Sequence, residues 1–248
     1  ESINLQTAAL AIFRLHYRDS HPSCIGTMTD LASTLSRNGD VAQAEDLFCQ
    51  GIDARKSICE SSPDDPYNFV NLGGACCNFG NFLKKRRNGK SAAIDAFSDA
   101  IVALKAADKI KPTAVAKRYL VNAFWSRSEV LADMGRFDEA LEDSDAAIRL
   151  ATTNGRRDAA ILYKAMVLAK QAKSRPAIKL VQDVLQRTDD SDMYFVAAEI
   201  AGIGLTTSVV QEGAATNREE LSKLAIDWLE QAHARGYFQI EYRVGDFQ

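Results

Sequence analysis

This 248-residue sequence is poor in the residues that mark metal sites, disulfide-linked folds and many enzymes. It has three histidines, five cysteines and no CxxC pair. An odd cysteine count in a chain of this size does not fit a disulfide framework, so we expect free thiols in a reducing compartment. His16, His21 and His233 are too scattered to form a ligand set. We therefore expect no cofactor and no metal site, and interpret the adjacent Cys76 and Cys77 as small packing residues rather than metal or redox groups.

The sequence also lacks an excess of positive charge and a long apolar run. Its formal net charge is −3, whereas general nucleic-acid surfaces are strongly basic. Apolar stretches such as Ala159–Ala169 are interrupted by Lys164 and are too short to span a bilayer. We expect a cytoplasmic protein that neither binds nucleic acid nor inserts into a membrane. The chain opens with Glu1 and no signal-peptide pattern, which we interpret as a fragment or a processed product.

What the sequence does contain is a helical pattern that occurs four times. A small residue is followed four positions later by a larger one and three positions after that by another small or branched one, which places all three on one helix face. The four occurrences are Ala44-Phe48-Gly51, Ala93-Phe97-Ala100, Ala140-Ser144-Ala147 and Ala177-Val181-Val184. Recurrence every few tens of residues indicates stacked helical hairpins.

Apolar periodicity and turn residues predict five hairpins and almost no strand. We place the hairpins at 27–60, 67–107, 113–151, 157–187 and 192–235, after a half-repeat at 1–19 and before a tail at 237–248, all in one domain spanning 1–248. Gly39, Gly80, Gly135 and Gly236 are the expected turn or stop glycines, and Ala172 stands where a fourth turn would favour glycine. His21-Pro22 is expected to close the first helix, Asn154-Gly155 the third hairpin, and Gln211–Thr216 to form a loop.

The second hairpin differs from the others. Asp65 and Pro66 suit the N-cap and first turn of its first helix. From Gly80 to Ala93 there are eight more residues than separate the equivalent pairs elsewhere, and the excess lies within the basic stretch 82–90. We interpret this insertion as an extended helix end or loop with solvated charges, and leave open that it docks an acidic partner.

The chain resembles tetratricopeptide (TPR) repeats, most closely in 124–140, where Met134-Gly135-Arg136-Phe137 precedes the small-residue face. The 41-residue spacing from Ala32 to Gly73 is similar to kinesin-light-chain repeats, and 221–237 is similar to the end of TPR regions attached to large bacterial serine/threonine protein kinases. The resemblance implies an all-α fold, a right-handed TPR-type α-solenoid of about five helical hairpins.

In TPR proteins the first helices of the hairpins line a concave groove that binds peptides. The resemblance therefore implies that this chain is a non-catalytic protein-interaction scaffold. Its expected groove residues are Thr29, Ser33, Arg37, Asn71, Asn78, Asn122, Trp125, Glu129, Met166 and Lys170. Asparagine amides can replace the hydrogen bonds that a docked peptide backbone loses to water, which makes Asn71 the best single contact residue.

Two roles for tryptophan stay open at this point. Trp125 is either a binding anchor or plain interhelix packing, whereas Trp228 is expected in the core. Arg37 and Lys170 are too few for a dedicated carboxylate clamp.

No catalytic residues can be proposed from spacing. The carboxylates Asp138, Glu139, Glu142, Asp143 and Asp145 fit a solvated helix face, and Asp189-Asp190-x-Asp192 fits a helix start better than a calcium loop. The alternative function is the regulatory or substrate-recruiting C-terminal region of a multidomain bacterial serine/threonine kinase, although no kinase motif is present in this chain. The partner is expected to be a protein or peptide, and the oligomeric state is left open.

Overall fold

A computed structural model describes residues 2–207 and 215–237. In these residues it contains eleven α-helices and no strand, which confirms the all-α prediction. The helices are α1 (Ser2–His16), α2 (Pro22–Asn38), α3 (Val41–Ser61), α4 (Pro66–Lys84), α5 (Lys90–Ile110), α6 (Ala114–Asp133), α7 (Phe137–Leu150), α8 (Asn154–Lys170), α9 (Ser174–Leu185), α10 (Ser191–Thr207) and α11 (Ala215–Ala234).

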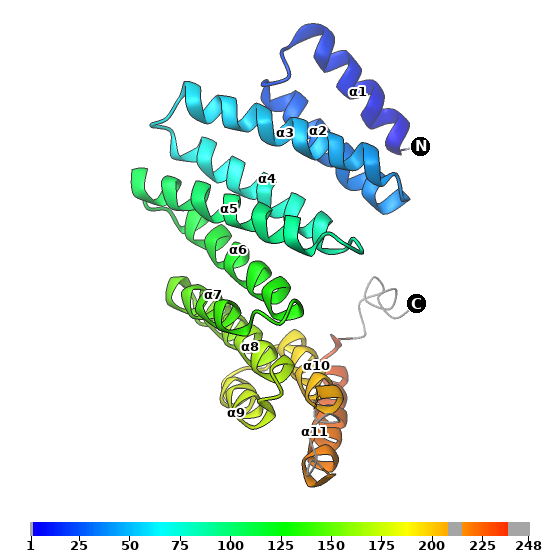
Figure 1. The fold of residues 1–248 in the computed structure, drawn as a ribbon, viewed down its shortest axis with the longest axis vertical. Helices are drawn as coiled ribbons and strands as arrows, with labels where there is room; N and C mark the ends of the chain where they lie inside the picture. Colours follow the sequence, from blue (N-terminus) through cyan, green and yellow to red (C-terminus); the bar gives the residue numbers. More distant parts are fainter. Residues whose placement is uncertain (1, 208–214, 238–248) are drawn as a thin grey trace. The chain divides into compact units, whose positions relative to one another are not determined.

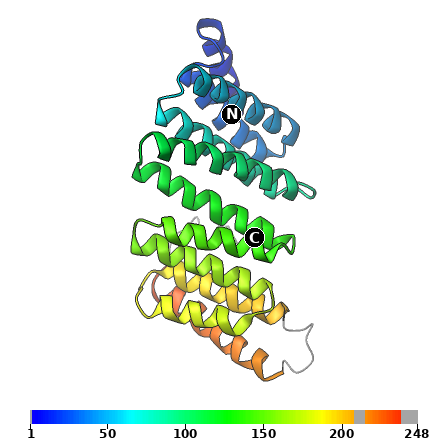
Figure 2. The same ribbon diagram turned by 60° about the vertical axis from the view of Figure 1, so that its left-hand side comes forward.

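The chain forms two compact units, Glu1–Val130 and Leu131–Gln248. In the first unit, helices α1 to α5 pack in chain order, each against the next, and α6 follows α5 (Figures 1 and 2). In the second unit α7 packs on α8, and α10 packs on α8, α9 and α11. Stacking of consecutive hairpins is the architecture expected of the TPR type. The prediction that 1–248 is one continuous domain stays a prediction.

Residues in the left-handed backbone conformation end several of the helices where the sequence predicts turns. Gly39, Gly135 and Gly236 have φ values of 92°, 76° and 87°. The fourth turn places Ala172 at φ 61°, the one non-glycine with positive φ among the described residues. A left-handed residue lets the last amides of a helix bond back to its carbonyls, and glycine does so without a Cβ clash. Ala172 therefore carries strain at a position that favours glycine.

The predicted turn at Gly80 is wrong. Gly80 lies inside α4, which continues to Lys84, and α5 begins at Lys90. A Cβ at Gly89 would lie 2.0 Å from the carbonyl oxygen of Leu83, so Gly89 is the glycine that this tight turn requires. The inserted residues lengthen α4, which confirms the extended-helix interpretation. The reason for Gly80 is packing, because a Cβ there would lie 2.7 Å from the Phe97 ring.

Two other boundaries differ from prediction. His21 and Pro22 begin α2 instead of closing α1, because the His21 ring accepts a hydrogen bond at Nδ1 from the Ser23 amide and Pro22 occupies the first turn. Residues 154 and 155 likewise begin α8, which Thr153 caps through Oγ1. In each case the preceding helix needs no dedicated stop residue. By contrast, Asp65 caps α4 as predicted, with Oδ1 accepting from the Tyr67 amide at 3.0 Å.

The recurring small-residue face is buried in all four hairpins. Its residues in α5, α7 and α9 have no exposed surface, and in α3 Phe48 is 5% exposed. Ser144 fits the interior because its hydroxyl donates to the Ala140 carbonyl at 2.9 Å. The prediction of a solvated carboxylate face is wrong at Asp143, which is only 5% exposed. Helices in a stack are covered on two sides, so more than one stripe is buried.

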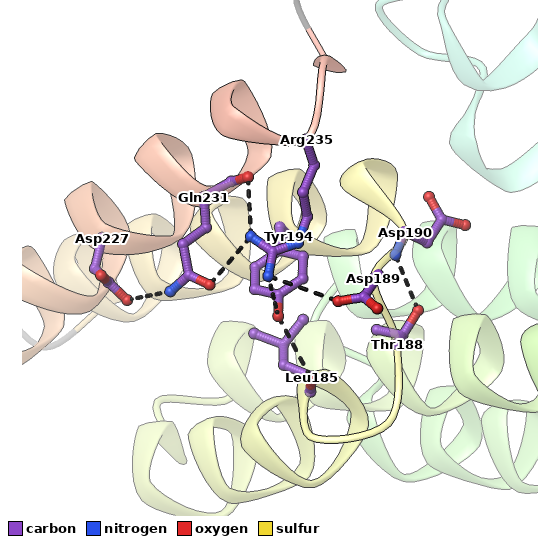
Figure 3. A network of polar contacts seen from close by, with 8 residues as sticks. All are labelled: Leu185, Thr188, Asp189, Asp190, Tyr194, Asp227, Gln231 and Arg235. Carbon is purple, nitrogen blue, oxygen red and sulfur yellow. Dashed lines mark hydrogen bonds and ion pairs between the residues drawn. The ribbon is translucent and has the colours of Figure 1, made fainter.

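The last two helices of the second unit, α10 and α11, pack on each other. Trp228 is 4% exposed within its core, as predicted. Figure 3 shows Arg235 at the end of α11, with its guanidinium carbon 4.0 Å from the centre of the Tyr194 ring. The same group donates to the Tyr194 hydroxyl at 3.3 Å and to the Gln231 carbonyl at 3.2 Å. Most of the loop predicted at 211–216 and all of the tail after Tyr237 lie outside the described residues.

Candidate partner-binding surface

The exposed face of α4 carries the best-placed candidate binding groups. Asn71 and Asn78 are exposed and seven residues apart, so they lie two turns apart on one face. Gly74 lies between them, and a Cβ there would lie 3.8 Å from the Tyr119 ring of α6. Neither asparagine amide has a hydrogen-bond partner among the residues that the structure describes. Two amides in this state can pair with the N–H and C=O groups of an extended peptide.

A pocket of about 120 Å³ opens beside Asn71 at the start of α4. It is lined by Pro22 and Ile25 from α2, Arg55 and Ile58 from α3, and Asn68 and Asn71 from α4. Arg55 was not predicted, because it lies on a second helix and its register gives no sign that it reaches the first helices. Its Nε is buried without a hydrogen-bond partner, and burial lowers the pKa of the guanidinium. The pocket lining holds this cation and two amides but no carboxylate.

Two of the predicted groove residues on α2 use their hydroxyls within the helix. Thr29 donates to the Ile25 carbonyl and Ser33 to the Thr29 carbonyl, each at 2.9 Å. Both residues are half-buried. Because each hydroxyl proton is donated within the helix, each oxygen can only accept a further hydrogen bond. Arg37 is exposed at the end of α2, with its Nε 3.4 Å from the Ser33 carbonyl.

The predicted residues on α6 are all half-buried. Asn122, Trp125 and Glu129 follow one another at spacings of three and four, on one side of the helix. The Oδ1 atom of Asn122 is buried without a hydrogen-bond partner. Glu129 accepts from Lys84 Nζ at 2.8 Å, so the inserted end of α4 engages a groove residue that the sequence could not connect to it.

The other two predicted residues belong to the second unit. Met166 is half-buried and packs against the core cluster of α8 to α11. Lys170 forms an ion pair with Asp133. The structure therefore places the predicted set in two groups: residues 29 to 129 on α2, α4 and α6 in the first unit, and these two residues on α8 in the second.

The basic insertion is largely paired within the first unit. Arg86 forms an ion pair with Glu45 and lies over the Phe82 ring, 5.7 Å from its centre. Lys85 and Arg87, which also belong to the insertion, are exposed, whereas Lys90 at its end is half-buried. Docking of an acidic partner at this insertion stays a prediction.

A second hollow, of about 360 Å³, lies between α3, α4 and α5. Ile52, Phe79 and Leu83 supply apolar lining, and Asp53, Asp95 and Asp99 supply carboxylates. Cys49 and Cys76 also line it, but neither is an activated thiol. Burial, with Asp99 nearby, raises the pKa of Cys76 to about 11, and burial followed by Glu45 and Asp53 raises the pKa of Cys49. Thiols held protonated are poor nucleophiles and poor metal ligands.

The described residues contain no cluster of three or more histidine, cysteine or acidic side chains that could hold a metal ion. Cys76 and Cys77 are 2% and 7% exposed, which agrees with their interpretation as packing residues. The acidic cluster before α10 begins a helix, as predicted, because Asp190 Oδ1 accepts from the Asp192 amide at 2.9 Å. None of the described helices is long and apolar enough to cross a membrane.

Comparison with known proteins gives a family match over part of the chain. Residues 24–67, which cover most of α2, all of α3 and the start of α4, match the tetratricopeptide repeat family model. Curated protein sequences give no significant match. Among solved structures, the nearly identical TPR-like repeats of a Podosopora anserina kinesin light chain share 15% identity at a TM-score of 0.51, covering 89% of this chain and 99% of that one.

Two further structures are similar at lower scores. MamA shares 14% identity, with 84% of this chain and 96% of that one covered at a TM-score of 0.45. YrrB, a TPR protein described as having an unusual peptide-binding site, shares 13% identity, with 86% of each chain covered at 0.38. At these identities the kinesin light chain likeness shows the fold alone, and this fold is the predicted TPR-like stack of helical hairpins.

Proposed function

We propose that this tetratricopeptide-repeat chain is a non-catalytic scaffold that binds an extended segment of a protein partner on the α2, α4 and α6 side of its first unit. The observation that carries the proposal is the pair of exposed, unpartnered amides of Asn71 and Asn78 on α4. A peptide that docks on a helical surface must replace the hydrogen bonds its backbone makes to water. Amides two turns apart can do so at two points along the peptide.

The pocket beside Asn71 favours a partner segment that carries an acidic side chain. Arg55 lines this pocket, and a carboxylate is the acceptor that a guanidinium binds best. The pocket volume of about 120 Å³ accommodates one acidic side chain. The partner segment therefore carries an aspartate or glutamate next to the residues that contact Asn71.

Affinity purification from the source cell, followed by titration of the purified partner, tests this proposal. Asn71→Ala combined with Asn78→Ala should leave the helical content unchanged and weaken partner binding about tenfold or more, because two peptide hydrogen bonds are lost. Asn88→Ala is the matched control, since Asn88 is also exposed but lies in the turn between α4 and α5. Undiminished binding by the double variant would move the site away from α4.

The acidic-residue preference is tested on the same titration. Arg55→Gln should weaken binding of the native partner segment but not of a segment whose acidic residue is replaced by its amide. Equal weakening of both segments would mean that Arg55 has a structural role only.

The kinase-associated role remains a prediction. It rests on the resemblance of residues 221–237 to kinase-linked TPR regions. A kinase domain encoded in the same reading frame would support it, and a complete short reading frame would remove it. Location in the cytoplasm likewise stays a prediction, to be checked by fractionation.

A further inference from the structure

The hollow of about 360 Å³ between α3, α4 and α5 is built from one face of each helix. The three helices follow one another in the first unit (Figure 1), and on each of them the lining residues recur at spacings of three and four. The face on α4 consists of Cys76, Phe79 and Leu83, roughly a third of a turn round that helix from Asn71 and Asn78. The hollow is therefore separate from the amides that we assign to the partner segment.

The floor of the hollow is apolar and preformed. Ile52 is 7% exposed and Cys76 is 2% exposed, whereas Phe79 is half-buried. The Phe79 ring stacks on Phe82 with the ring centres 6.1 Å apart and lies 5.8 Å from the ring centre of Phe48. These contacts fix the ring, so an occupant gains free energy by covering its remaining surface with apolar atoms.

The floor is surrounded by negative charge. Four carboxylates and one cation line the hollow: Glu45, Asp53, Asp95, Asp99 and Lys56. Asp53, Asp95 and Asp99 are exposed, and none of them makes a hydrogen bond or ion pair with another residue that the structure describes. The charge of Asp99 reaches the floor, because it contributes, after burial, to the raised pKa of Cys76. The hollow thus presents an apolar surface under an acidic rim whose charge is not balanced.

The chain itself shows which group this rim accepts. Arg86, in the turn between α4 and α5, forms an ion pair with Glu45, the first lining residue of α3. The same guanidinium lies over the Phe82 ring, 5.7 Å from its centre. An arginine that combines a carboxylate with an aromatic ring therefore already occupies one end of the hollow. Farther along, the Phe79 ring and the carboxylate of Asp99 offer the same two partners to a second arginine.

The arrangement suits an organic cation better than a metal ion. Within the part of the chain that the structure describes, no three acidic, histidine or cysteine side chains are grouped closely enough to hold a metal. Carboxylates spread along two helices can instead pair with a guanidinium, whose donors form a wide planar fork. An arginine side chain also lays its methylene stem on apolar surface while its charged end reaches the rim.

We propose that this hollow is a second docking site, which binds an arginine-containing basic segment of a protein partner. The arginine stem lies on Phe79 and Leu83, and its guanidinium pairs with Asp95 and Asp99, which are one helical turn apart on α5. The acidic rim attracts such a segment and repels acidic ones. This site goes beyond the proposed function, because the segment proposed for the α4 amides is acidic and lies on another face.

Fluorescence anisotropy on the full chain, with the labelled peptide Ala-Ala-Leu-Arg-Ala-Leu-Arg-Ala-Ala as the probe, tests the proposal. The wild type should bind the peptide with a Kd of roughly 10–100 µM. Binding should weaken when the salt concentration is raised from about 50 to 500 mM. The same peptide with citrulline in place of arginine keeps the shape without the charge, and it should bind about tenfold more weakly or worse.

Variants of the chain locate the binding. Asp95→Asn combined with Asp99→Asn should weaken binding of the arginine peptide about tenfold, because both carboxylates that pair with it lose their charge. Glu60→Gln combined with Asp64→Asn is the matched control, since it removes two exposed carboxylates outside the hollow and should bind like the wild type.

Ala92→Phe tests the hollow itself without a change of charge. Ala92 is exposed and lines the hollow, so a phenylalanine there fills the space that the arginine stem needs and should block the peptide. Circular dichroism checks the fold of each variant.

Four results would overturn the proposal. They are the absence of saturable binding up to about 1 mM peptide, equal binding of the arginine and citrulline peptides, an equal loss in the control variant, and undiminished binding by Ala92→Phe. The third would assign the binding to diffuse surface charge, and the fourth would place the peptide outside the hollow. Asn71→Ala combined with Asn78→Ala should leave arginine-peptide binding unchanged, so this proposal and the proposed function fail separately.

Discussion

Gly80 of α4 lies against the ring of Phe97 of α5, so closely that a Cβ atom at position 80 would come within 2.7 Å of Phe97 Cε1. Seven residues earlier, a Cβ at Gly73 would come within 2.4 Å of Leu104 Cγ. Both pairs lie on one seam, because the two helices run antiparallel and the contacts repeat after two turns. Phe97 and Leu104 have no exposed surface and no room to move aside.

Gly80→Ala is expected to destabilise the chain by about 1–3 kcal/mol. Overpacking against a fixed ring outweighs the gain that alanine brings to a helix interior. The midpoint of urea unfolding measures the change. Gly26→Ala is the matched control, because Gly26 lies within α2 with nothing within 4 Å of its Cβ position, and it should gain roughly 0.5–1 kcal/mol. Equal effects at the two positions would contradict the close seam.

Ala172→Gly is expected to stabilise the fourth hairpin. Alanine at φ 61° is strained, and glycine relieves this strain while it adds unfolded-state freedom, for a net gain of about 0.5–1 kcal/mol. Gly135→Val should do the opposite, because its φ of 76° excludes a β-branched residue at a cost of about 1–3 kcal/mol. Thermal melting of both variants should move the midpoint in opposite directions. A loss of stability in Ala172→Gly would exclude turn strain.

Stability should fall steeply at alkaline pH because of two buried thiols. Burial raises the pKa of Cys76 to about 11 and that of Cys77 to about 12, whereas an unfolded cysteine ionises near 8.5. The folded state keeps these protons to a higher pH than the unfolded state does. The contribution of the thiols to the free energy of unfolding is therefore complete below about pH 8.5 and is lost as pH rises through 11 and 12. The loss is roughly 1.4 kcal/mol per pH unit for each thiol in that window.

Denaturant unfolding at pH 8 and pH 10.5, in a phosphine reductant, measures this loss. Lysines and tyrosines also titrate at high pH, so the relevant quantity is the difference between the wild type and the variant with Cys76→Ala and Cys77→Ala. The variant should lose less stability between the two pH values. Identical pH slopes would show that both thiols ionise freely in the folded chain.

Arg235→Lys is expected to loosen the last hairpin by about 1–2 kcal/mol, although it keeps the charge. Lysine cannot lie flat on the Tyr194 ring while it also bonds to the tyrosine hydroxyl and to Gln231, as the guanidinium does in Figure 3. Unfolding by urea, with hydrogen exchange in α11, measures the loss. Lys223→Ala removes an exposed pair with Glu219 and should change stability by about 0.5 kcal/mol or less.

The positions and faces of the helices could be predicted from the sequence, because they depend on local periodicity and turn chemistry. Apolar spacing identified the small-residue faces, and Gly39 and Gly135 marked turns whose left-handed geometry only glycine adopts without strain. The Asp65-Pro66 start followed from capping alone. The mistake at Gly80 arose because glycine marks either a turn or a close approach, and a single sequence does not separate the two. The mistake at residues 154–155 has another source, since a polar pair after an apolar stretch can end one helix or begin the next, and here Thr153 caps α8.

The candidate site depended more on tertiary structure. The sequence named Asn71 and Glu129, but it could not connect Arg55 to the first or Lys84 to the second, because these pairs are distant in the chain and meet only through helix stacking. Burial of Asp143 follows from which helices have neighbours on both sides. Local sequence determines which residues share a helix face, whereas only the packed chain decides which of those faces are covered.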